Sequence, residues 1–180
     1  MANDILILKN KCDTARKDLS TISHNIISMC EKILDACLSK TNSFGEPNSE
    51  MAKSEIINIS VKCIKEINTL LDSALECVNV IYRSMIKYNE LGSTPIYKSS
   101  RDYSSEDIFA HSYFFSLANE IGNVFEDLYE KEVPKVLNEA LNGLDIDNDG
   151  AQIKVSVITA SIKKIAASVS KATKFYFSED

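Results

Sequence analysis

The sequence has no tryptophan, and its 180 residues include five glycines and three prolines. An all-β protein needs many tight turns, which glycine and proline supply, so this scarcity argues against an all-β fold. Basic residues are outnumbered by acidic ones, 20 against 26, which gives a net charge of -6. This balance argues against nucleic acid as a partner, because phosphate binding requires a basic surface.

Long apolar runs are also missing. The uncharged stretch of residues 108–119 is shorter than the roughly 20 apolar residues that a membrane-spanning helix needs. The first residues, MANDILILKNKCD, lack the basic segment that precedes the apolar run of a secretory signal peptide. We therefore expect a cytoplasmic protein without a membrane partner. Export without a leader is compatible with the same residues.

The five cysteines all fall in the first half of the chain. We expect them to be reduced, buried thiols, because the cytoplasm is a reducing compartment. An alternative is a pair of cross-links. If the first two predicted helices fold back on each other, Cys12 comes near the level of Cys77, and Cys30 near that of Cys63. No spacing of cysteine and histidine indicates a zinc site, and no cofactor is expected.

Four long helices are predicted from apolar residues that repeat at alternating steps of three and four. The clearest stripe lies in the second helix and consists of Ile57, Ser60, Ile64, Ile67, Leu71, Ala74, Val78, Ile81, Met85 and Tyr88. A kink is expected near Pro134, because proline removes a backbone donor from the helix interior. The predicted helices are residues 3–40, 49–91, 105–142 and 150–177.

The apolar faces of these helices are wider than a two-stranded coiled coil needs. In the first predicted helix, for example, Ile27, Cys30 and Leu34 lie beside the main seam. Wide faces favour a bundle of more helices, so we predict an all-α, antiparallel four-helix bundle. It should form one domain over residues 1–180, built from hairpins 1–91 and 105–180 and a linker, 92–104.

Charge divides the last two predicted helices. Residues 101–149 carry twelve acidic and three basic side chains, whereas residues 150–178 carry five lysines and no acid. Opposite charges on neighbouring helices favour an antiparallel hairpin with ion pairs along its flanks. Each exposed pair contributes only about 0.2–1 kcal/mol, so the charges select the pairing more than they stabilise it.

One loop resembles a calcium-binding motif. Asp145, Asp147 and Asp149, followed by Gly150, resemble the first half of an EF-hand loop. The twelfth position, which should hold a bidentate glutamate, is Ser156, so calcium binding there should be weak. The alternative is an acidic turn in which Asp149 caps the next helix. We assign no metal site on this pattern.

No pattern of residues indicates a catalytic site, so we expect a non-enzymatic protein that acts through protein–protein interaction. An adaptor, an inhibitor or an immunity-like binder would fit an acidic bundle of this size. A partner with a basic surface is expected to meet the acidic third helix, and replacing its acids with lysine should then abolish binding. The residues expected to make this contact are Glu126, Asp127, Glu130 and Glu132.

Other functions fit parts of the sequence. The linker offers a second contact region, because aromatic and arginine side chains are common in interfaces; its residues are Ile96, Tyr97, Arg101 and Tyr103. Wide apolar faces are also compatible with a homodimer. The alternative function is that of a secreted or membrane-active helical protein, such as an export substrate, its helper or a pore-forming component. A weakly calcium-responsive bundle is the second alternative.

Overall fold

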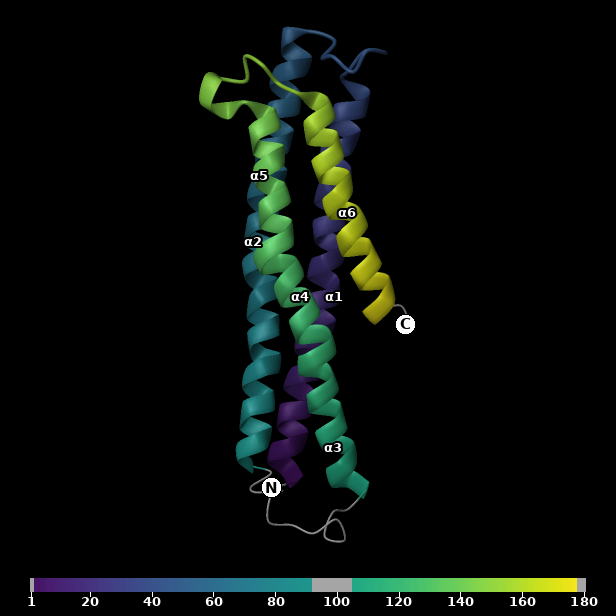
Figure 1. Cartoon of the computed structure of the whole chain (residues 1–180), viewed down its shortest axis with the longest axis vertical. Helices are drawn as coiled ribbons and strands as arrows, with labels where there is room; N and C mark the ends of the chain where they lie inside the picture. Colours follow the sequence, from purple (N-terminus) through teal and green to yellow (C-terminus); the bar gives the residue numbers. More distant parts are fainter. Residues whose placement is uncertain (1, 92–104, 178–180) are drawn as a thin grey trace.

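The computed structural model describes residues 2–91 and 105–177, which form long helices packed side by side (Figure 1). The two longest α-helices are α1, Ala2–Ser39, and α2, Glu50–Leu91. They run antiparallel and are joined by a tight turn. Ser49 caps α2, because its Oγ accepts the N–H of Ala52 at 3.0 Å.

Helix α2 buries the stripe that its sequence predicts. Ile57 and Met85 are half-buried, and the other stripe residues are buried. Ala52, Ile56 and Cys63 widen the buried face. The spacing of apolar residues was therefore sufficient to identify which side of this helix faces the core.

A continuous helix over residues 105–144, called here the third helix, contains two π-helical segments. Its parts are α3 (Ser105–Ser116), η2 (Leu117–Gly122, π), α4 (Asn123–Glu126), η3 (Asp127–Glu132, π) and α5 (Val133–Leu144). A π segment has more residues per turn than an α-helix, so it shifts the apolar stripe around the helix. As a result, Val124 of the predicted seam is half-buried, whereas Phe125 and Tyr129 are fully buried.

The third helix continues through Pro134. Proline lacks the N–H that would bond the carbonyl of Glu130 in an α-helix. The second π segment ends just before it, where the N–H of Val133 bonds the carbonyl of Leu128, five residues back. The interruption expected near Pro134 therefore takes the form of a π segment. The helix ends at Leu144, two residues beyond the predicted end.

The loop before α6 differs from the prediction. It contains a 3₁₀ turn, η4 (Ile146–Asn148), between residues of positive φ. The carboxylate of Asp145 accepts the backbone N–H of Gln152 at 2.8 Å. Asp149 has a left-handed φ of 55° and lies well before the first residue of α6, Val155. The predicted helix start at residue 150 and the Asp149 cap are wrong, because the side chain of Asp145 organises this loop instead.

Helix α6, Val155–Phe177, is short: it has 23 residues, against 42 in α2. At ~1.5 Å per residue it spans about 35 Å, whereas α2 spans about 63 Å. It packs against α1 and α5 and ends partway along the bundle (Figure 1). The described residues thus confirm a four-helix bundle, but one end of it contains only α1, α2 and α3. We call this part the three-helix end.

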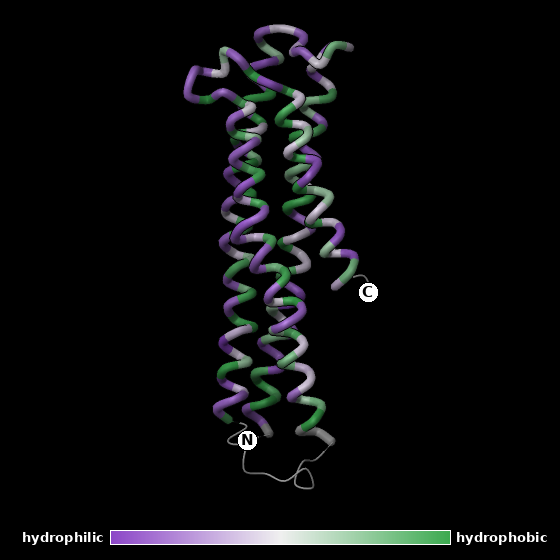
Figure 2. The backbone as a smooth tube through the Cα atoms, in the orientation of Figure 1, coloured by the Kyte–Doolittle hydropathy of each residue, from purple (hydrophilic) through white to green (hydrophobic). Residues whose placement is uncertain are grey.

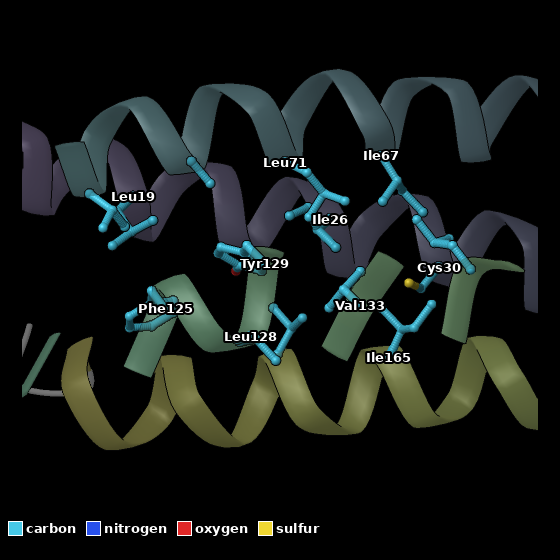
Figure 3. Packing of buried hydrophobic residues seen from close by; sticks show 14 of the residues in the cluster. Leu19, Ile26, Cys30, Ile67, Leu71, Phe125, Leu128, Tyr129, Val133 and Ile165 are labelled. Atoms are coloured by element: carbon cyan, nitrogen blue, oxygen red, sulfur yellow. The ribbon is translucent and has the colours of Figure 1, made fainter. Parts of the chain in front are cut away.

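The core of the four-helix half draws on every long helix (Figure 3). The residues labelled there are Leu19, Ile26 and Cys30 from α1, Ile67 and Leu71 from α2, Phe125, Leu128, Tyr129 and Val133 from the third helix, and Ile165 from α6. The Tyr129 hydroxyl lies 2.5 Å from Ser23 Oγ, which itself donates to the carbonyl of Leu19 at 2.8 Å. Tyr129 is therefore the donor to Ser23, and both buried hydroxyls are satisfied.

Replacing Ser60 with alanine is expected to raise the free energy of unfolding by about 1–3 kcal/mol, the cost of an unsatisfied buried polar group. Ser60 Oγ is buried in the α2 stripe and has no hydrogen-bond partner among the described residues. Urea denaturation measures the change. The matched control is Ser23→Ala, which should destabilise, because it removes the acceptor of the Tyr129 hydroxyl. A loss of stability in both variants would contradict the prediction.

All five cysteines lie within the described residues and are buried free thiols. Burial raises the pKa of each thiol above its ordinary value. For Cys30, burial and then the neighbouring Cys63 raise the pKa to about 12. For Cys12, burial raises the pKa and the neighbouring Ser84, about two turns along α2 from Cys77, lowers it. The structure contains the free thiols that were expected first, and neither of the two cross-links.

Candidate interaction surfaces

The three-helix end exposes large apolar side chains on each of its helices. Six of those described are more than half exposed there: Leu6, Ile7, Ile86, Ile108, Phe109 and Phe115. Figure 2 shows the apolar positions at this end of the bundle. Large exposed apolar patches on a soluble domain indicate contact with another molecule, because leaving such area in water is unfavourable.

Helix α3 contributes half of these side chains, and they lie in a stretch that differs from the rest of the third helix in charge. Residues 108–119 carry no acidic or basic side chain apart from one histidine. On the buried side, Phe114 stacks on Tyr88 of α2, with ring centroids 4.6 Å apart. On the outer side, Phe109 is 63% and Phe115 is 53% exposed. We call Ile108, Phe109 and Phe115 the α3 apolar face.

A polar contact fixes α3 against the start of α1. The hydroxyl of Tyr113 donates to the Asp13 carboxylate and lies 3.3 Å from the carbonyl of Lys9. Burial, and then Asp13, raise the pKa of Tyr113 above its ordinary value. The Lys9 ammonium lies 5.4 Å from the ring centroid of Phe109. These contacts hold α3 in place and so make the apolar face a fixed part of the fold.

A second surface is a groove of about 820 Å³ between the third helix and the end of α6. We call it the α6 groove; it is lined by Val124, Asp127, Leu128, Glu132, Ser168, Lys171, Ala172, Lys174, Phe175 and Tyr176. The floor combines apolar residues with the small side chains of Ser168 and Ala172. Small residues on α6 leave the space that larger ones would fill. Phe175 stands at the rim and is 78% exposed.

The two walls of the α6 groove carry opposite charges. Asp127 and Glu132 come from the third helix, and Lys171 and Lys174 come from α6. No ion pair within residues 2–91 and 105–177 joins α6 to the third helix. Asp127 pairs instead with Lys131 on its own helix, at 3.4 Å. The expected ion pairs along this hairpin are therefore not formed in the described structure, and the α6 lysines lie on exposed positions.

Comparison with protein family models, with curated proteins and with solved structures gives no match. We therefore infer function from the two surfaces themselves.

The four acids predicted to bind a partner lie in different surroundings. Asp127 and Glu132 share the α6 groove, and Glu132 accepts a hydrogen bond from Ser168 at 3.0 Å. Glu126 is half-buried beside Tyr82 of α2, where burial and then Glu126 raise the pKa of Tyr82 to about 12. Glu130 is exposed. Two of these acids therefore line the groove, and the other two do not.

Of the remaining predicted sites, the aspartate loop lies within the described residues and the linker does not. Within the described ranges, no group of three or more His, Cys, Asp or Glu side chains is placed to hold a metal ion. The loop candidates Asp145, Asp147 and Asp149 are thus not gathered around a common point. The predicted linker contacts lie outside the described residues; they are Ile96, Tyr97, Arg101 and Tyr103.

Sequence reasoning missed both surfaces found here. The α3 apolar face was visible as the uncharged stretch 108–119, but the sequence did not show that α6 stops short of it. One wall of the α6 groove carries Lys171 and Lys174, which were among the lysines expected to pair with the third helix. Locating the groove requires the relative positions of two helices, which their periodicities do not give.

Proposed function

We propose that this protein is non-enzymatic and acts by binding another protein through the α3 apolar face, as an adaptor, an inhibitor or an immunity-like binder. The observation that carries this proposal is the exposure of Phe109 and Phe115 within residues 108–119, an uncharged part of the third helix that α6 does not cover. Aromatic residues are enriched in the buried centres of interfaces, where charged residues are depleted.

The chemistry of the α3 apolar face indicates what kind of surface its partner presents. The α3 apolar face lacks charge, so the partner must present apolar side chains of its own. A second copy of this chain meets that requirement. The protein has a net charge of -6, so two copies repel each other in general, but pairing their uncharged patches brings no like charges together. A partner with a basic surface could add contacts to Asp127 and Glu132 farther along the third helix.

Membrane activity, the alternative function, has less support. The apolar face of α6 is buried in the core and includes Ile158, Ile162 and Val169. This helix would therefore have to leave the bundle to enter a bilayer. Among the residues that the structure describes, no helix combines the length and apolar character of a membrane span. The exposed lysines of α6 allow surface attraction to anionic lipid, but the helix offers it little apolar area.

The test introduces charge on the α3 apolar face. In the double variant Phe109→Asp and Phe115→Asp, recovery of the bound protein from the source cells should fall by about tenfold or more, as for a buried hot spot. Quantitative mass spectrometry of the affinity-purified protein measures this. The control is Phe44→Asp, which places the same charge on a side chain that is 88% exposed, in the turn between α1 and α2.

Two further readouts decide the outcome. Thermal melting shows whether the double variant is folded, which the exposure of both side chains leads us to expect. Light scattering shows whether the partner is a second copy, in which case the wild type is a dimer and the double variant a monomer. An unchanged set of bound proteins together with an unchanged mass would contradict the proposal.

A further inference from the structure

We propose that the α6 groove binds an amphipathic helix of a partner protein, one that carries basic residues along one flank and acidic residues along the other. This inference rests on the proposed function only in assuming that the protein binds another protein. The groove and the α3 apolar face are separate surfaces. The inference comes from the shape of the groove, its apolar floor and the charges of its walls.

The floor of the groove has the spacing that accepts a helix. Val124 and Leu128 are four residues apart on the third helix. Ala172 and Tyr176 have the same spacing on α6. Two such rows form parallel ridges with a channel between them, into which the side chains of another helix can pack. The lining from Ser168 to Tyr176 is about 12 Å long at ~1.5 Å per residue, which corresponds to about two turns of a bound helix.

The walls specify the flanks of the bound helix. Asp127 and Glu132 attract basic side chains on one flank, while Lys171 and Lys174 attract acidic ones on the other. No described ion pair engages either lysine, so their charges are available to a partner. A helix with like charges on both flanks would meet attraction on one wall and repulsion on the other.

An aromatic residue at the rim of the groove, Phe175, is placed to contact a bound helix. Phe175 is 78% exposed, and its ring contacts that of the neighbouring Tyr176, with centroids 4.8 Å apart. An exposed aromatic side chain beside an apolar channel gains buried area when a helix is seated there. The π segment η3 forms part of the opposite wall, and π segments inside α-helices are often found at functional sites.

Three synthetic helical peptides of about 14 residues, each long enough to fill the groove, test the proposal. All share a leucine stripe; one carries lysine on one flank and glutamate on the other, one carries lysine on both, and one carries glutamate on both. The wild-type protein should bind the mixed peptide about tenfold more tightly than either of the others. Fluorescence anisotropy measures the dissociation constants.

Charge reversal should change this preference in a defined way. The variant Lys171→Glu with Lys174→Glu makes both walls acidic, so it should prefer the peptide with lysine on both flanks. The variant Asp127→Lys with Glu132→Lys should prefer the peptide with glutamate on both flanks. Lys163→Glu with Lys164→Glu is the matched control: it makes the same charge change on α6 outside the groove and should keep the wild-type preference.

The outcomes separate this site from the α3 apolar face. Equal binding of the three peptides, absence of binding, or a change of preference in the control variant would overturn the inference. Phe109→Asp with Phe115→Asp should leave the peptide preference intact. If that variant keeps its natural partner while the groove variants switch peptides as expected, the proposed function fails and the groove inference stands.

Discussion

Replacing Phe125 with alanine is expected to lower the free energy of unfolding by about 3–5 kcal/mol, as for other large aromatic side chains removed from a core. Phe125 is fully buried where the third helix meets the end of α6. Its ring lies 5.6 Å from that of Tyr129, 5.9 Å from that of Tyr176 and 5.3 Å from that of Phe177. Alanine would leave a cavity among these rings, and urea denaturation measures the loss.

The control for this prediction is Phe44→Ala. Phe44 is 88% exposed, so the same deletion should change stability by no more than about 0.5 kcal/mol. Hydrogen exchange gives a second readout, because α6 is held at its end by Phe125 and by the bond from Arg16 Nη2 to the carbonyl of Tyr176, at 3.0 Å. Exchange near Tyr176 should accelerate in Phe125→Ala. A loss below about 1 kcal/mol would show that this junction is not tightly packed.

The protein is expected to lose stability steadily as the pH is raised from about 9 towards 12. The native fold keeps the Cys30 thiol protonated up to about pH 12, whereas the unfolded chain releases that proton near its ordinary pKa of 9.0. Above pH 9 the unfolded state therefore binds fewer protons than the native state, and the free energy of unfolding falls as pH rises. For Cys30 alone the upper limit is on the order of 4 kcal/mol.

Urea denaturation repeated between about pH 8 and pH 12 measures this slope. Burial also raises the pKa values of Tyr82 and Tyr129, so several groups contribute. Cys30→Ala should flatten the slope without removing it, although it also creates a cavity and lowers stability at every pH. The slope is the decisive quantity, since the cavity shifts the whole curve. An unchanged slope in this variant would show that Cys30 is not the principal buried acid.

The long helices were predictable because a helix buried on one side needs apolar residues at the helical period, and this spacing is visible in the sequence. The stripe from Ser60 to Tyr88 on α2 shows this clearly, since its residues lie where the three-and-four spacing places them. The third helix was harder. Its π segments displace the core from Val124 to Phe125, and no α-helical repeat anticipates such a change in residues per turn.

The errors at α6 have a different origin. Three aspartates follow one another in the loop, and any of them could bond a nearby N–H, so the sequence did not show that Asp145 takes this role. Likewise, the charge balance of a helix does not say which face its lysines occupy. Lys171 and Lys174 were expected to pair with the third helix, and they instead form one wall of a groove. Both features depend on the tertiary arrangement.

Because α6 is short and comes last in the chain, the two ends of the bundle can pack at different times during synthesis. Helices α1, α2 and α3 leave the ribosome first, so the three-helix end can be completed while α6 is still being made. Until then, the side of the core that α6 covers, including Phe125, has no cover. The bond between Arg16 and Tyr176 joins residues 160 positions apart and can form only once α6 has emerged. The nascent chain is therefore most exposed to aggregation or to chaperones in its four-helix half.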